Sequence, residues 1–163
     1  MAFYNGKNAE ELYDKYADML YRIALTHSHD SEDAMDAVQD VFVKCFTLQK
    51  IFFDEEHCKA WLIRATINRC HDITRKKKVR SYVPLDEIYD VPEQKEGIAP
   101  DLKSLLDELL EKYKDVVVLH YLEGFSIEEC AKILSLSVSA VKMRLMRARE
   151  FVKQSYTKEE LYD

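Results

Sequence analysis

The chain has 163 residues, a formal net charge of -6 and 47% hydrophobic residues, a composition that supports a packed core and excludes wholesale disorder. It shows no apolar run near the ~18 residues of a membrane span and no signal-peptide pattern, so we expect a cytoplasmic protein without membrane insertion. Its four widely spaced cysteines are then expected to be reduced thiols. Only three glycines and three prolines are present, which favours an all-α fold.

Charge is distributed unevenly along the chain. Residues 59–80 hold eight Lys or Arg against one acidic residue, and residues 142–153 hold five against one. The rest of the chain holds 28 acidic and 11 basic residues. Two basic segments on an acidic body predict contacts with a polyanion at two places. The alternative is two solvated helix faces.

Three helices are predicted before residue 80. Apolar residues recur every three or four positions near 8–26, within 31–47 and within 55–78. One face of the third helix combines aromatic, amide and basic groups, which suits unpaired bases. That face consists of Trp61, Arg64, Asn68, Asp72 and Arg75. Phe52, in the preceding loop, could form a pocket for an extruded base, although residues such as Trp61, Phe52 and Phe53 are more often part of a hydrophobic core.

All three prolines lie within one segment, "YVPLDEIYDVPEQKEGIAPD". Because a helix cannot continue through this spacing of prolines, residues 80–100 are predicted to be a linker. The linker would separate two small helical domains, residues 1–79 and residues 101–163.

The second domain is predicted to begin with an amphipathic helix, "LKSLLDELLEKY", and a buried one, "KDVVVLHYL". Gly124 can close the buried helix. Ser126 and Glu129 form a capping-box pattern that opens the next helix, and after a short break Ser137 is a plausible N-cap for the last.

The last helix has an apolar stripe and a cationic outer surface. The stripe consists of Val138, Val141, Leu145, Ala148 and Val152. The outer positions are Ser139, Ala140, Met143, Met146 and Arg147, with Lys142, Arg144 and Arg149 beside them. A short helix, a tight break and a basic helix predict a helix-turn-helix whose second helix enters the major groove. An amphipathic surface helix with a cationic back is the alternative.

Three stretches together resemble a known family. "DSEDAMDAVQDVFVKCF", "AWLIRATINRCHDITRKKK" and "SIEECAKILSLSVSAVKMRLMRAREFV" are similar, in that order and spacing, to bacterial extracytoplasmic-function (ECF, group 4) RNA polymerase sigma factors of the sigma-70 family. The resemblance implies a first domain (region 2) that binds core RNA polymerase and melts the −10 element. It implies a second domain (region 4) that reads the −35 element as duplex.

The resemblance also implies roles for particular residues. Those implied to contact core polymerase are Asp36, Gln39, Asp40 and Val43. Those expected at the −10 element are Phe52, Trp61, Arg64, Asn68 and Arg75. Those expected at the −35 element are Ser139, Lys142, Met143, Arg144, Met146 and Arg147. The chain departs from the family at Ser135, where many members have Gly, and at Met143 and Met146, where small or polar residues are common.

Expected partners are core RNA polymerase, promoter DNA and an anti-sigma factor, and we expect a monomer. The sequence shows no signature of an enzyme, and the adjacent His–Cys pairs lack zinc-ligand spacing, so neither catalysis, a cofactor nor a metal is predicted. Two alternatives to the sigma factor remain open at this point. They are a helix-turn-helix regulator that acts without polymerase and a helical interaction protein.

Overall fold

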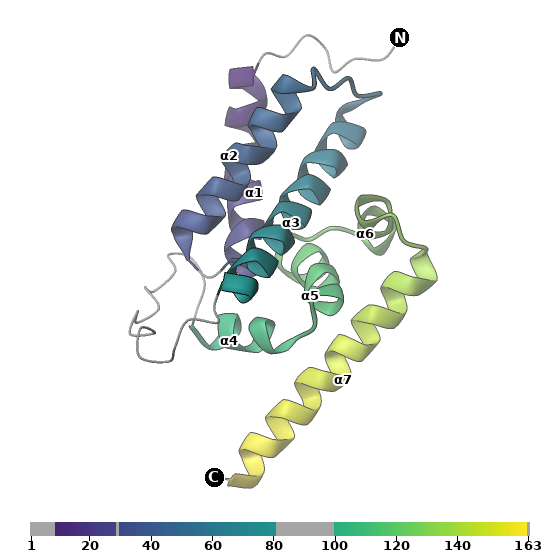
Figure 1. The fold of residues 1–163 in the computed structure, drawn as a ribbon. Helices are drawn as coiled ribbons and strands as arrows, with labels where there is room; N and C mark the ends of the chain where they lie inside the picture. The colour runs from purple at the N-terminus through teal and green to yellow at the C-terminus, as the bar shows by residue number, and fades with distance from the viewer. Residues whose placement is uncertain (1–8, 29, 81–99, 163) are drawn as a thin grey trace. The chain divides into compact units, whose positions relative to one another are not determined.

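The structure, a computed structural model, describes residues 9–28, 30–80 and 100–162. The described chain forms helices without strands, which confirms the all-α prediction, and it divides into two units, residues 1–98 and 99–163 (Figure 1). The predicted linker lies outside the described residues except at its ends. None of the described helices has the length and apolar character needed to cross a membrane.

The first unit consists of three helices packed on one another: α1 (Ala9–His27), α2 (Ser31–Thr47) and α3 (Glu55–Arg80). These bounds confirm the three helices that the apolar periodicity predicts. Their apolar stripes meet in a core that includes Leu20, Ile23, Val38, Leu62, Ile63 and Ile67. Asp30 caps α2, because its side chain accepts a 2.7 Å hydrogen bond from the Asp33 amide.

Polar contacts connect α3 to the other two helices of this unit. The Tyr16 hydroxyl donates to Glu55 at 3.0 Å, and Arg69 Nε donates to Asp40 at 2.8 Å. Lys77 pairs with Asp33, and this contact raises the pKa of the lysine. Since the charged groups are partly exposed, each pair adds at most about 1 kcal/mol to stability. The apolar core therefore holds the unit together, and the ion pairs of Arg69 and Lys77 add surface links between α3 and α2.

The second unit contains α4 (Pro100–Glu108), α5 (Glu111–Val117), a π-helical turn η2 (Val118–Leu122), α6 (Ile127–Leu134) and α7 (Val138–Tyr162). The prediction of one amphipathic helix over "LKSLLDELLEKY" is wrong, because Leu110 adopts an extended backbone (φ -61°, ψ 147°) that separates α4 from α5. Asp107 joins the two helices because its carboxylate accepts hydrogen bonds from Lys103 at 2.8 Å and from Lys114 at 3.0 Å. Burial opposes its ionisation, but these two bonds keep the pKa of Asp107 below its usual range.

The turns on either side of α6 have the predicted chemistry. Gly124 lies in the left-handed region (φ 78°) after η2. Ser126 and Glu129 form the predicted capping box, with both hydrogen bonds at 3.1 Å. The Ser137 hydroxyl accepts from the Ala140 amide at 3.1 Å, which confirms it as the N-cap of α7. Between them Ser135 also has a positive φ, 55°, and ends α6.

Candidate nucleic-acid interface

Helix α7 separates an apolar face from a cationic one. Val141, Leu145 and Ala148 are buried, and α7 packs through them against α5 and α6. On the other side the side chains predicted for the −35 element reach solvent. Ser139, Lys142, Met143, Met146 and Arg147 are exposed, and Arg144 is half-buried. The capped start of α7 therefore presents cations and two thioethers together.

A shallow hollow of about 530 Å³ lies over the start of α7. Its lining from the turn and α7 is Ser137, Ser139, Ala140, Met143, Arg144 and Arg147. Two further residues, Lys112 and Tyr113, come from the start of α5. The sequence did not point to these two residues, because they lie more than twenty positions from α7, at the end of the stretch predicted to form the amphipathic helix "LKSLLDELLEKY". The cation of Lys112 and the aromatic ring of Tyr113 were the sequence features that could have indicated a nucleic-acid contact.

Arg149 is held by a neighbouring element. Its guanidinium Nη1 donates to the Tyr121 hydroxyl of η2 at 2.8 Å. Both side chains are exposed, so the contact lies at the edge of the cationic face and limits the reach of Arg149.

A groove of about 640 Å³ lies between α2 and α3 of the first unit. Trp61, Arg64 and Asn68, all predicted for the −10 element, line it from α3. Asp40 and Val43, predicted for polymerase, line it from α2. The structure thus brings parts of two predicted sets to one groove.

Other predicted residues lie outside this groove. Asp36 and Gln39 are exposed on α2. Arg75 is exposed further along α3, where it pairs with Asp72 at 3.7 Å. Arg69, which no motif singled out, lines the groove and bonds to Asp40.

The loop before α3 requires a correction of the predicted base pocket. Phe52 is only 2% exposed and packs its ring against Trp61 (5.8 Å between centroids) and His57 (5.4 Å). A ring buried in this way is a core residue and does not offer a face to a base. Phe53 is 79% exposed and stacks on His57 with an interplanar angle of 28°. Both residues belong to one "IFF" run, in which hydrophobicity alone does not indicate the buried ring.

The far end of α2 exposes apolar side chains beside the groove. Val43 is 63% exposed, and Leu48 and Ile51, which follow it, are 55% and 67% exposed. Large apolar side chains clustered on a surface indicate a protein contact. Sequence reasoning named only Val43 of this cluster.

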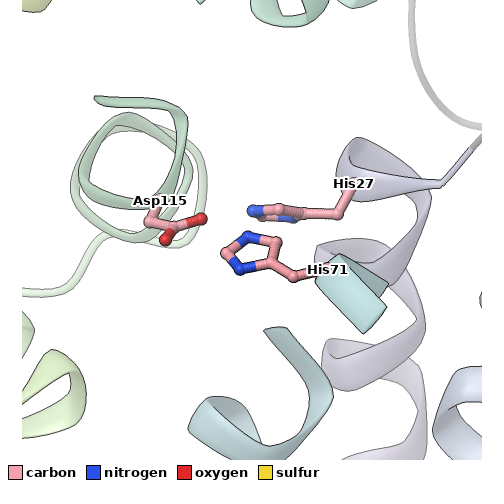
Figure 2. A group of neighbouring side chains, drawn as sticks. All are labelled: His27, His71 and Asp115. Atoms are coloured by element: carbon pink, nitrogen blue, oxygen red, sulfur yellow. The ribbon is translucent and has the colours of Figure 1, made fainter. Parts of the chain in front are cut away.

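Two histidines of the first unit lie side by side, with ring centroids 5.6 Å apart (Figure 2). His27 Nδ1 lies 3.0 Å from the Ile23 carbonyl oxygen and 2.8 Å from the Thr26 hydroxyl. The His27 ring is therefore engaged by the last turn of its own helix, which is the behaviour of a C-terminal cap. Asp115, also drawn in Figure 2, belongs to the second unit.

Comparison with known proteins agrees with the division into two units. A family model for sigma-70 region 2 matches residues 12–80, and one for sigma-70 region 4 matches residues 101–152. RNA polymerase sigma factor SigV of Bacillus subtilis is 30% identical over 143 residues, which cover 86% of each chain. ECF RNA polymerase sigma factor SigM of Mycobacterium tuberculosis is 30% identical over 142 residues, covering 86% of this chain and 72% of its own.

Solved structures show the same fold. The sigma factor RpoE of Bartonella quintana, crystallised with the anti-sigma factor NepR, matches with a TM-score of 0.70 at 24% identity, covering 89% of this chain and 94% of its own. CnrH, in complex with the cytosolic domain of CnrY, matches with a TM-score of 0.63 at 24% identity, covering 92% and 88%. Two helical units bearing region 2 and region 4 define a sigma-70-type initiation factor. The chain belongs to the ECF RNA polymerase sigma factors.

Proposed function

We propose that the chain is an alternative sigma factor that binds core RNA polymerase and directs promoter-specific initiation of transcription. The exposed cationic face of α7, which follows a capped turn in an otherwise acidic protein, is the observation that carries this proposal. In this role the protein acts in the cytoplasm as a non-enzymatic monomer. Residues 1–79 serve polymerase and the −10 element, and residues 101–163 serve the −35 element.

At the −35 element, α7 lies in the major groove. Arg147 is exposed opposite the buried stripe and points toward base edges, with Ser139, Met143 and Met146 beside it. Lys142 and Arg144 flank this face and contact phosphates. Lys112, across the hollow, adds a cation from α5 for the same backbone.

At the −10 element, α3 binds the unpaired strand. Asn68 reads a base edge, and Arg64 and Arg75 contact the backbone. Phe53 replaces Phe52 as the stacking ring for an extruded base, since Phe53 is the exposed one. Trp61 supports this surface: Lys50 Nζ lies 5.3 Å from its ring and Phe52 packs on it.

Core polymerase contacts the exposed residues of α2. Asp36, Gln39 and Asp40 supply the polar part of the surface and Val43 the apolar part. An anti-sigma factor that covers the same apolar end of α2 would keep the protein inactive. This partner is suggested by the complex of the sigma factor RpoE with the anti-sigma factor NepR.

The test is transcription in vitro from a promoter library, with purified core RNA polymerase and the full chain. Sigma-dependent, promoter-specific transcripts are expected. A helix-turn-helix regulator would bind duplex without altering the start sites chosen by core polymerase. A helical interaction protein would neither direct promoter-specific transcripts nor bind duplex DNA.

A further inference from the structure

The outer face of α7 has an apolar centre. Met143 lies opposite the buried Val141 and Leu145, and 52% of the residue is exposed. Met146 is 48% exposed beside it. The cations Lys142, Arg144 and Arg147 surround this centre, so an exposed thioether lies between charged side chains on the outer face of the helix.

A thioether at the centre of a reading helix favours one base edge over the others. In the major groove, guanine and adenine present hydrogen-bonding groups and cytosine an amino group, whereas thymine also presents its C5 methyl. A methionine placed over a polar edge would remove water without supplying a partner, which is unfavourable. Over the thymine methyl the same side chain gains apolar contact and loses no hydrogen bond.

The two methionines are not equivalent. Met143 lines the hollow over the start of α7 together with Ser139, Arg144 and Arg147, and Met146 does not. Cations in the same hollow can hold the phosphates while the Met143 side chain meets a base. Resting on the proposed function of α7, we propose that Met143 is a specificity-determining residue that recognises the C5 methyl of a thymine in the −35 element.

The experiment uses holoenzyme assembled from the full chain and core RNA polymerase. A duplex library with a randomised −35 segment is selected for binding. The selected duplex is then remade with uracil at one thymine at a time, which removes only the methyl group. We expect one such replacement to weaken binding by the wild type about three- to fivefold, the effect of one buried methyl-sized group.

Variants at positions 143 and 146 show which methionine causes the loss of binding on uracil duplexes. Met143→Ala should bind the thymine and uracil duplexes equally, whereas the matched control Met146→Ala should keep the difference. Met143→Gln should move the preferred base at that position toward adenine, whose N6 and N7 pair with an amide. Both substitutions at 143 are on an exposed helix surface, where folding tolerates them.

Three results would overturn the inference while leaving the proposed function intact. They are a selected −35 segment without thymine, uracil replacements that all change affinity by less than twofold, and a uracil effect that persists in Met143→Ala. A holoenzyme that selects no sequence would overturn the proposed function, and the inference with it.

Discussion

At the scale of single residues, backbone conformation accounts for a departure from the family pattern. Ser135 adopts φ 55° at the end of α6, a left-handed conformation that disfavours side chains and suits Gly. A Gly at this position would adopt the same turn without that strain. Ser135 keeps the same turn at an energetic cost.

Ser135→Gly should stabilise the second unit, because Gly removes the penalty of the left-handed conformation. We expect the free energy of unfolding to rise by about 0.5–1 kcal/mol, measured by urea denaturation of the full chain. Ser137→Ala is the opposing control, since it removes the N-cap of α7 and should cost about 1 kcal/mol. A destabilised Ser135→Gly protein would contradict this account of the turn.

Arg147 and Lys142 should differ in what they contribute to DNA binding. Arg147→Ala removes the group proposed to read base edges and should cost holoenzyme about 1–3 kcal/mol on the preferred −35 duplex, relaxing preference there. Lys142→Ala removes the proposed phosphate contact and should weaken binding similarly on every sequence. Binding is measured on preferred and scrambled −35 duplexes. Equal losses on both by Arg147→Ala would remove Arg147 from base reading.

At the scale of secondary-structure elements, the helices of the first unit could be predicted from the sequence. Three uninterrupted 3.6-residue patterns, each with a single apolar stripe, gave α1, α2 and α3 within two residues. The break at Leu110 could not be predicted, because "LLDELLEK" contains no Gly or Pro. There the tertiary packing of Leu106 and Leu109, both buried, overrides a continuous helical pattern.

For the candidate site, the sequence was sufficient to predict which face of each helix is exposed. The exposed sides of α3 and α7 follow from where their buried stripes lie. Which of Phe52 and Phe53 is buried depends on the path of the loop, and Lys112 reaches the α7 hollow only through the packing of α5 on α7. Such contacts depend on residues distant in sequence, which periodicity does not report.

Reversing one charge on α2 should separate folding from polymerase binding. Asp40→Arg loses the 2.8 Å ion pair with Arg69 and places two cations together, but both groups are partly exposed, so the cost to stability should stay near 1 kcal/mol. Core polymerase binding should fall sharply. The measurements are circular dichroism and a core-binding titration.

Two controls accompany this variant. Arg69→Ala breaks the same ion pair but keeps Asp40, so it reports the part of the loss due to the pair. Asp18→Arg makes the same charge change on an exposed position of α1. Melting of the Asp40→Arg protein would show that Asp40 is structural.

The α3 face and its loop should act when the −10 element opens. Asn68→Ala and Phe53→Ala should preserve polymerase binding and −35 contact but reduce open complexes on duplex promoters, since each stacked base contributes ~1–3 kcal/mol. Permanganate reactivity of −10 thymines is the measurement. A pre-melted −10 bubble should rescue Phe53→Ala only partly, because it supplies melting but not stacking.

Phe52→Ala is the structural comparison for this experiment. Removing a ring that is 2% exposed should destabilise the first unit by about 3–5 kcal/mol. Wild-type reactivity in both Asn68→Ala and Phe53→Ala on duplex templates would refute the single-strand role of α3.

At the scale of the whole molecule, charge is concentrated where DNA is expected. Eight basic residues within 59–80 and five within 142–153 lie in a chain whose net charge is -6. Each basic segment is short, and the acidic remainder repels phosphates. Neither unit alone therefore carries enough positive charge to bind DNA tightly. When both units contact one promoter, binding of one unit raises the effective concentration of the other at its site, and this increases the affinity.

The free protein should accordingly bind a promoter duplex weakly, in the range of non-specific binding, about 10⁻⁴–10⁻⁶ M at physiological salt. Core polymerase should raise the affinity by a factor on the order of 10²–10⁴, because it holds both units on the same DNA and allows the −10 strand to open. Fluorescence anisotropy of a labelled promoter, with and without core polymerase, measures the difference. The control is a scrambled promoter measured in the presence of polymerase. Its affinity should show only a small part of the increase that polymerase gives on the specific promoter. Nanomolar, sequence-specific binding by the free full-length protein would contradict the charge argument and favour a regulator that acts without polymerase.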